Sequence, residues 1–144
     1  MEPIGYQIKM LSKLFGETIK MKVEKSGISV TQFHIIKFLD INSDCEVTQK
    51  DICEYLKMKA PTISITLTNM ENDNLIYRRK SEKDSRKTFI ALSSEGYKLA
   101  ASCKKIFKEL DQIMESSLSS EELILLNQSL NKMKNKLLEV QNNG

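Results

Sequence analysis

The positive charge of this sequence is concentrated in one short stretch. Six lysines and arginines and two carboxylates fall between Arg78 and Lys87, so the stretch carries a net charge of +4, whereas the whole 144-residue chain carries +3. Grouped guanidinium and ammonium ions bind phosphate oxygens, and a narrow A·T-rich minor groove attracts an inserted arginine. The stretch is therefore a candidate phosphate-binding site, and the elements around it decide what it can reach.

The length and composition indicate one ordinary globular domain. A chain of 144 residues buries roughly two-thirds of its unfolded surface, which suffices for a core without disulfides or metals. No apolar run approaches the roughly 20 residues of a membrane span, and the first residues, MEPIGYQIKM, lack a signal peptide's basic head and apolar block. We therefore expect a cytoplasmic protein without a membrane partner.

Groups for catalysis or metal binding are sparse. The sequence has one histidine, five glycines and no glycine-rich phosphate loop, and no nucleophile has an evident base. Its cysteines, Cys45, Cys53 and Cys103, are widely spaced and form no Cys-x-x-Cys pair, which argues against a zinc site or a disulfide framework. We expect no enzymatic activity, no catalytic residue, no metal, no cofactor, and reduced thiols.

Both ends of the chain have the apolar spacing of amphipathic helices. Apolar residues recur every three or four positions within residues 4–19, 99–113 and 123–140. Unbroken steps of three and four are typical of coiled-coil seams. Such seams pack within the chain or against a second copy, and the pattern is compatible with both.

Local patterns mark four helix starts, near residues 31, 48, 93 and 119. Thr48 and Ser119 each have a carboxylate three residues on, the spacing of a capping box. Thr31 and Ser93 are each preceded by an apolar residue that has a partner five positions on, the spacing of a hydrophobic staple. We expect a helix to begin at each of these positions.

The middle of the chain reads as helix, turn, helix and hairpin. The helix that begins at Thr48 is short, and Pro61 fits the first turn of the next helix because its missing N–H is harmless there. Asn74 tolerates the left-handed conformation that ends a helix. Residues 75–80 and 87–92 then read as short strands around the polar loop SEKDSR. The cationic cluster therefore lies on a hairpin that follows a helix-turn-helix.

The run LTNMENDNLIYRRKSEKDSRKTFIALSSEG, residues 67–96, resembles the signature of MarR-type transcriptional regulators. The shared features are a recognition helix, a basic hairpin wing with an Asp-x-Arg tip at Asp84 and Arg86, and a serine-rich start to a long helix. Two positions depart from the family pattern. Asn74 stands where glycine is usual, and Ile65 stands where many members have arginine.

The resemblance implies a mainly α fold with a small β-hairpin wing: a winged helix-turn-helix flanked by N- and C-terminal dimerisation helices. Residues 1–144 would form a single MarR-like domain, with the DNA-binding part at 28–92 and the dimerisation helices at 4–25 and 93–141. Two copies would present recognition helices about one DNA turn apart, which implies a pseudo-palindromic operator. The residues assigned to dimerisation are Ile8, Leu11, Phe15, Leu110, Leu126, Leu130, Met133 and Leu137.

The second helix of the helix-turn-helix has an outward face without charge. Its spacing predicts that Ile63, Leu67 and Met70 are buried, which turns the hydroxyl and amide side chains outward. Such groups read base edges in the major groove, and an isoleucine suits a thymine methyl group, so the site leans toward A·T. Alternatively these are ordinary solvent-facing residues, and a neighbour covers Ile65. The candidate base-reading residues are Thr62, Ser64, Ile65, Thr68 and Asn69.

The wing supplies the remaining candidate DNA contacts. The resemblance makes Arg86 the residue that enters the minor groove, and Asp84 would hold its guanidinium by charge-assisted hydrogen bonds. The alternative is a solvated loop whose surface ion pair contributes at most about 1 kcal/mol. The other positions expected to bind DNA would contact phosphates and so position the protein along the duplex. They are Gln49, Lys50, Lys59, Arg78, Lys83 and Lys87.

These features predict a regulator that binds double-stranded DNA as a homodimer, with repression as the expected mode. Family members commonly lose DNA affinity when a small phenolic or anionic compound binds or when a cysteine is oxidised, so a small-molecule effector and a redox response are both open. Cys45 lies between Asp44 and Glu46, whose charges disfavour a reactive thiolate. The competing hypothesis is a winged-helix module whose basic hairpin binds an acidic protein and no DNA.

Overall fold

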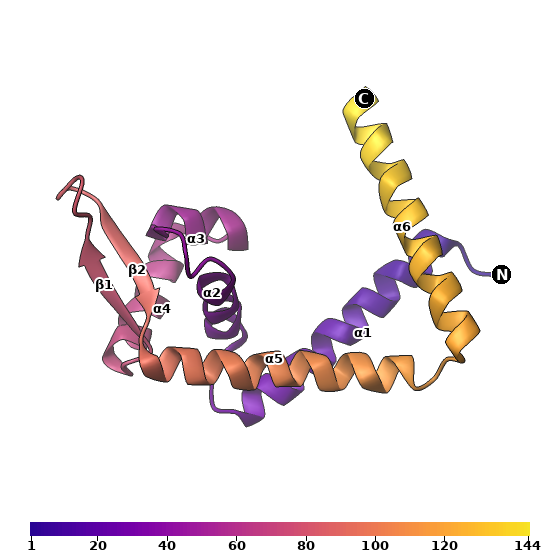
Figure 1. Ribbon diagram of the computed structural model, residues 1–144, viewed down its shortest axis with the longest axis horizontal. Helices are drawn as coiled ribbons and strands as arrows, with labels where there is room; N and C mark the ends of the chain where they lie inside the picture. The colour runs from indigo at the N-terminus through magenta and orange to yellow at the C-terminus, as the bar shows by residue number, and fades with distance from the viewer. The chain divides into compact units, whose positions relative to one another are not determined.

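The computed structural model describes residues 1–144 and is mainly helical, with one antiparallel pair of strands (Figure 1). Contacts divide the chain into two units, residues 1–107 and residues 108–144. The helix-turn-helix and the hairpin expected from the sequence are confirmed, and they lie in the first unit. In chain order the elements are α1 (Ile4–Lys25), α2 (Val30–Ile41), α3 (Gln49–Leu56), α4 (Ala60–Asn72), β1 (Ile76–Lys80), β2 (Thr88–Leu92), α5 (Ser94–Glu115) and α6 (Ser120–Asn143).

The helix starts follow the capping patterns, with one correction. Thr48 and Ser119 each form the expected capping box, which satisfies two backbone N–H groups at the start of the helix. The helix expected to begin near residue 31 begins at Val30, but Thr31, the residue inside the predicted staple, does not cap it. Ser29 is the capping residue, and Gln32 returns the hydrogen bond by accepting from the Ser29 N–H at 3.1 Å. Thr31 has no glutamate or glutamine three residues on, so it cannot form such a box.

Residues with positive φ end the two helices of the helix-turn-helix. Lys57 (φ 54°) ends α3, which the sequence did not predict, and Asn74 (φ 61°) follows α4, as the sequence predicts. The N–H groups of Asn74 and Leu75 donate to carbonyls of the last turn of α4, at 3.0 and 2.9 Å. The chain therefore turns directly from α4 into β1.

The core of the first unit is a continuous cluster of aliphatic side chains. Ile63, Leu67 and Met70 of α4 are fully buried, as their spacing predicts. Burying a side chain of this size stabilises the fold by about 1.5–3 kcal/mol relative to leaving it exposed. This burial fixes which face of α4 points outward. The other buried members of the cluster are Ile35, Ile36, Leu39, Val47, Ile52, Ile76, Ile90, Leu92 and Ala100.

The hairpin pairs β1 with β2 in antiparallel register, with Ile76 opposite Leu92 and Lys80 opposite Thr88. Paired residues share one face of the sheet, and the buried pair at the base places that face on the core. On the other edge of β2, the Ile90 N–H donates to the Val47 carbonyl at 2.8 Å, which ties the hairpin to the loop before α3. The turn of the hairpin extends away from α2 and α3 (Figure 1).

Gly96 sets how closely the start of α5 approaches the base of the hairpin. A Cβ atom at this position would overlap the carbonyl oxygen of Leu75, so the close approach requires glycine. Beside it, the Ser93 Oγ accepts from the Gly96 N–H at 3.0 Å, and the Ser93 hydroxyl donates to the Asn74 carbonyl at 2.6 Å. These contacts fix the end of α4, the start of β1 and the start of α5 to one another.

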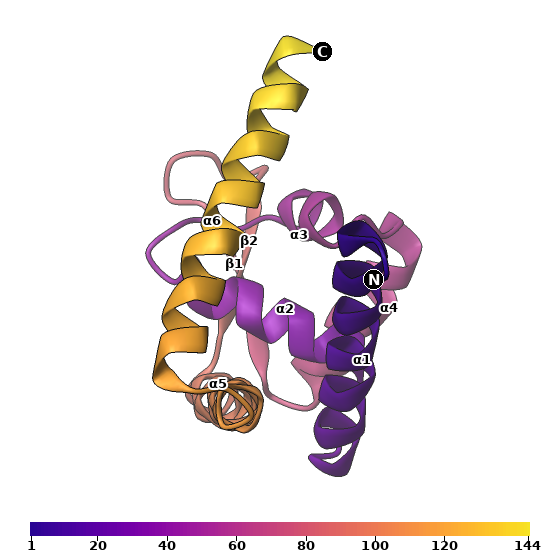
Figure 2. The ribbon, with the colours of Figure 1, turned by 90° about the vertical axis from the view of Figure 1, so that its right-hand side faces the viewer.

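Helix α1 packs against α2 (Figure 2), and its buried residues, Ile19 and Val23, lie in its C-terminal half. Three aromatic rings connect α1, α2 and α5 inside the first unit. The centre of the Phe107 ring lies 5.8 Å from that of Phe15 and 5.3 Å from that of Phe33. Ring pairs at these distances attract one another beyond the burial of their area.

The second unit contains the end of α5 and all of α6. No residue of α6 is buried, although leucines recur along the helix. None of the helices in the chain has the length and the apolar character that a membrane span requires.

Candidate nucleic-acid interface

The outward face of α4 is uncharged and exposed. Thr62, Ile65, Thr68 and Asn69 are exposed, and Ser64 is half-buried. Ile65 is 65% exposed, so the alternative that a neighbour covers its side chain is wrong for the single chain. A branched apolar group displayed among hydroxyls and amides has the chemistry to contact a thymine methyl group.

The helix itself orients one hydroxyl on this face. The Thr68 hydroxyl donates to the Ser64 carbonyl one turn earlier, at 2.9 Å. A hydroxyl whose hydrogen is used inside the helix presents its oxygen lone pairs to the outside. Thr68 is therefore set as an acceptor, which suits the amino groups of adenine or cytosine in the major groove.

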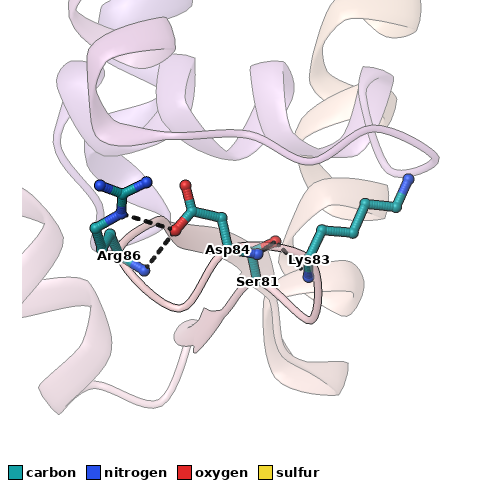
Figure 3. Close-up of polar contacts among 4 residues, drawn as sticks. All are labelled: Ser81, Lys83, Asp84 and Arg86. Carbon is teal, nitrogen blue, oxygen red and sulfur yellow. Dashed lines mark hydrogen bonds and ion pairs between the residues drawn. The ribbon is translucent and has the colours of Figure 1, made fainter.

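The tip of the hairpin is a tight loop closed by side-chain to backbone hydrogen bonds (Figure 3). The Oγ of the buried Ser81 accepts from the N–H groups of Lys83 and Asp84 at 3.2 and 3.3 Å. The Asp84 carboxylate accepts from the backbone N–H and the Nε of Arg86 at 3.1 and 3.2 Å. The predicted contact between Asp84 and the Arg86 guanidinium is therefore confirmed.

These contacts also determine the charge at the tip. Hydrogen bonds from the Arg86 backbone and then from its guanidinium lower the pKa of Asp84, so the carboxylate is charged at neutral pH. The Arg86 side chain is 89% exposed and that of Asp84 is 32% exposed, so the arginine projects and the aspartate supports it. Lys83 and Lys87 beside them are exposed as well. An oriented arginine loses less conformational freedom when it binds.

Three more candidates lie around the turn between α3 and α4. Lys50 and Lys59 are exposed, and the Lys50 ammonium lies 4.0 Å from the Glu54 carboxylate in a weak surface pair. Gln49 is half-buried, and its amide nitrogen donates to the Ala60 carbonyl at 3.4 Å. Gln49 therefore links the two helices, while both lysines remain directed to solvent.

Arg78 is placed differently from the other cations of the cluster. Its side chain is 29% exposed, and its Nε lies 3.7 Å from a carboxylate oxygen of Glu71 on α4. That Nε is buried and has no hydrogen-bond partner. Arg79, one residue on, is exposed and lies over the Phe89 ring at 5.4 Å from its centre. The structure thus brings Lys83, Arg86 and Lys87 together at the tip and turns Arg78 toward α4.

The residues assigned to dimerisation differ in exposure. Phe15 and Met133 are half-buried, and Leu110 is buried within the single chain. The other five are between 39% and 65% exposed, which is unusual for large apolar side chains repeated along helices. These five are Ile8, Leu11, Leu126, Leu130 and Leu137.

Sequence reasoning missed a cavity of about 290 Å³ between α2 and α5 of the first unit. Its walls are mostly apolar and come from segments that are far apart in the sequence, so no local pattern marks it. The Lys37 ammonium lies 4.3 Å from the centre of the Phe107 ring, and Lys104 forms an ion pair with Asp40 at 2.9 Å. The lining residues are Phe33, Lys37, Asp40, Ile41, Ala100, Cys103, Lys104 and Phe107.

The cysteine in this cavity wall is not activated. Burial raises the pKa of the Cys103 thiol to about 11, so the thiol is protonated at neutral pH and is a poor nucleophile. Cys45 is exposed in the loop after α2, and Cys53 is half-buried in α3. The three thiols are free, and the placement of Cys53 and Cys103 favours small packing residues.

Comparison with known proteins finds the same arrangement elsewhere. A family model described as the MarR family matches residues 26–87. The transcriptional regulator HosA of Escherichia coli is 35% identical over 126 residues, which cover 87% of this chain and 92% of HosA.

Solved structures of one regulator resemble the whole chain. MepR, a transcription regulator of the Staphylococcus aureus multidrug efflux pump MepA, aligns with a TM-score of 0.85 and 32% identity over 94% of this chain and 99% of MepR. MepR in complex with DNA aligns with a TM-score of 0.72 and 32% identity, over 95% of this chain and 99% of that chain. MepR bound to ethidium bromide aligns with a TM-score of 0.66 and 32% identity, over 94% of this chain and 97% of that chain.

Proposed function

We propose a repressor function from one premise: the chain belongs to the MarR family of transcriptional regulators. The comparisons confirm the resemblance to this family. Since its members are transcriptional regulators, they also confirm the expectation that the chain is not an enzyme. The proposed target is a pseudo-palindromic, A·T-leaning operator in double-stranded DNA, bound by two copies of the chain. Residues 28–92 would bind DNA, and residues 4–25 and 93–141 would form the dimer.

One observation carries the proposal: an oriented, projecting Arg86 lies on the same unit as an exposed, uncharged face of α4. An inserted arginine suits the minor groove, and hydroxyls, amides and an apolar group suit base edges in the major groove. We assign Arg86 to the minor groove. The major-groove assignments are Thr62, Ser64, Ile65, Thr68 and Asn69, and the phosphate assignments are Gln49, Lys50, Lys59, Lys83 and Lys87.

The exposed leucines of α6 and the apolar residues of α1 support the homodimer. A single winged unit is a weak reader of sequence, whereas two units related by a two-fold axis read two half-sites at once. Large apolar side chains that are exposed in one copy gain about 25 cal/mol for each Å² that a second copy covers. The DNA partner has separate support, because MepR, which aligns along nearly all of this chain, has a structure in complex with DNA.

The cavity between α2 and α5 supports a small-molecule effector that relieves repression. The rings of Phe33 and Phe107 line it together with aliphatic groups, which suits a flat aromatic compound. Lys37 places an ammonium group at its wall, which favours a phenolic or anionic substituent, whereas the Lys104 ammonium is already paired with Asp40. A structure of the relative MepR bound to ethidium bromide, whose organic ion is a flat aromatic cation, supports the flat aromatic shape but not the anionic substituent.

Selection of bound sequences from a random DNA duplex pool tests the function. Wild type, Arg86→Ala and the control Lys98→Ala are compared at near-physiological salt. The control removes the same charge from an exposed position on α5. We expect wild type and the control to enrich an A·T-leaning inverted repeat that Arg86→Ala binds more weakly. No enrichment by wild type would point instead to a module that binds an acidic protein.

A further inference from the structure

We propose that Arg78 and Glu71 form an ion pair that sets the angle of the hairpin against α4, so that Arg78 positions the wing and does not bind phosphate. The proposal rests on the proposed DNA-binding function. It assigns a role to Glu71, a carboxylate on the recognition helix, and gives Arg78 a different role from the other cations of the cluster.

The strand register places Arg78 on the protein side of β1. Ile76, two residues earlier on the same face, is buried, and Ile90, the residue directly opposite Arg78, is buried as well. Residues two apart in a strand, and residues paired across a ladder, lie on one face. The Arg78 side chain therefore leaves the strand on the core side and runs toward α4, whereas Arg79 leaves it on the opposite side.

The electrostatics at this contact favour a fixed pair over a free cation. The buried Nε of Arg78 has no hydrogen-bond partner, and its distance of 3.7 Å to the Glu71 oxygen exceeds that of a hydrogen bond. A shift of about half an ångström would complete the bond, and a buried donor gains stability when it is satisfied. The pair is partly shielded, because the two side chains are 29% and 43% exposed.

Glu71 is otherwise in an unfavourable place. It lies in the last turn of α4, where the helix dipole disfavours a negative charge. It also places a carboxylate on the unit that is proposed to approach phosphates. Both unfavourable interactions of Glu71 are offset if its partner is Arg78. The pair then joins the helix proposed to read bases to the hairpin that carries Arg86.

The substitution Glu71→Gln separates positioning from direct contact. If Arg78 binds phosphate, removing the nearby carboxylate frees the arginine and leaves operator affinity unchanged or higher. If the pair positions the wing, Glu71→Gln weakens operator binding by about tenfold despite the lost negative charge, a coupling of ordinary size for neighbouring groups. Arg78→Gln should have a similar effect, and the double variant should bind no more weakly than either single variant.

The control is Glu82→Gln, which removes an exposed carboxylate from the wing loop without touching the pair. We expect it to bind the operator at least as tightly as wild type. Hydroxyl-radical footprints of the variants on the selected operator give the second readout. Glu71→Gln should lose protection at the outer, wing-contacted positions and keep the protection given by α4.

The possible results are distinct. Tight binding by Glu71→Gln beside weak binding by Arg78→Gln would show that Arg78 contacts phosphate, and would overturn the proposal. Equal loss of wing and α4 protection, with a lowered melting temperature, would mean that the pair only stabilises the fold, and would also overturn it. Failure of wild type to bind any duplex would instead refute the proposed DNA-binding function, and this inference with it.

Discussion

The wing tip and the outward face of α4 are both exposed, but the chain builds them differently. Ser81, Asp84 and Arg86 are joined by hydrogen bonds within one short loop, so the geometry of the tip is largely a property of that loop. The direction of the α4 face depends on the burial of Ile63 and Leu67 in a core drawn from α2, α3 and both strands. The placement of charge at the tip therefore depends on local hydrogen bonds, whereas the direction of the α4 face proposed to read bases depends on tertiary packing.

This difference separates affinity from sequence preference. A projecting cation gains binding free energy from phosphates and from the counterions they release, so its contribution falls as salt rises. Hydroxyl, amide and apolar groups add little to the salt dependence but distinguish base pairs. Substitutions at the tip should therefore change the affinity and its salt dependence, whereas substitutions on α4 should change the sequence preference. This holds only if the packing around Gly96 keeps both surfaces in place.

Gly96→Ala tests the packing that holds both surfaces in place, and it has the largest expected effect. The added Cβ would overlap the Leu75 carbonyl oxygen, where the base of the hairpin meets α5. Overpacking against backbone should lower the free energy of unfolding by about 2–3 kcal/mol. We expect operator affinity and sequence preference to fall together, with a lower denaturation midpoint in urea.

The matched control for this change is Gly16→Ala in α1. Nothing lies within 4 Å of a Cβ at Gly16, and alanine favours a helix over glycine by up to about 1 kcal/mol. The control should therefore equal or exceed wild type in stability. A Gly96→Ala protein as stable as wild type would contradict the close approach of α5 to the Leu75 carbonyl.

Arg86→Ala should have the next largest effect, confined to the wing. We expect operator affinity to fall by about tenfold or more, and the slope of log K against log salt to fall by about 1 for each subunit. Preference at the base pairs read by α4 should remain. Fluorescence anisotropy titrations over a range of salt concentrations measure both quantities.

An unchanged salt slope in Arg86→Ala would mean that the tip does not reach the DNA backbone or groove. Loss of sequence preference at the base pairs read by α4 would mean that the wing and α4 do not act separately. Either result would break the comparison between a charge-placing surface and a base-reading surface.

Ile65→Ala should have a smaller effect, confined to base readout. Contact of an apolar side chain with one methyl group contributes about 1 kcal/mol, or about fivefold in affinity. Replacing the contacted thymine by deoxyuridine, which lacks the methyl group, should weaken wild type by that factor and leave Ile65→Ala unaffected. The salt slope should be the same for both proteins.

The deoxyuridine scan also has a negative outcome. If no thymine-to-deoxyuridine change distinguishes wild type from Ile65→Ala, then Ile65 does not contact a thymine methyl group. The A·T preference proposed for α4 would then have to come from Thr68, Asn69 and the shape of the groove.

Features of the fold that depend on near neighbours in sequence could be predicted. The capping box of Thr48, the left-handed Asn74 and the contact between Asp84 and Arg86 each involve partners within three residues. The capping residue of α2 was missed although its box is equally local, because the apolar spacing around Thr31 is also that of a helix start. Ser29 and Gln32 contain the signal that decides between them.

Features that depend on distant neighbours could not be predicted. The cavity needs α2 beside α5, and the Phe33–Phe107 contact that lines it joins residues with no local relation. Arg78 is an intermediate case. Strand alternation places it on the same face as the buried Ile76, but its partner Glu71 is identified only when β1 lies beside α4.

Asp84→Ala should have the smallest effect, because an exposed pair orients Arg86 without supplying the charge. Hydrogen bonds from the Arg86 backbone and guanidinium lower the pKa of Asp84, so the contact is complete at neutral pH and is lost only in acid, as the pH falls through the lowered folded-state pKa. We therefore expect Asp84→Ala to bind the operator about threefold more weakly than wild type, by the same factor from pH 5 to pH 8. Affinities at constant salt across this range give the ratio.

The ratio of the two affinities isolates Asp84 from other groups that titrate in the same range. His34, whose pKa is lowered by burial, is present in both proteins, so any effect of its titration cancels in the ratio. A ratio that changes between pH 5 and pH 8 would mean that Asp84 titrates there, which the bonds from Arg86 forbid. A ratio of one at every pH would mean that Arg86 reaches the DNA equally well without support, and the tip would then act through charge alone.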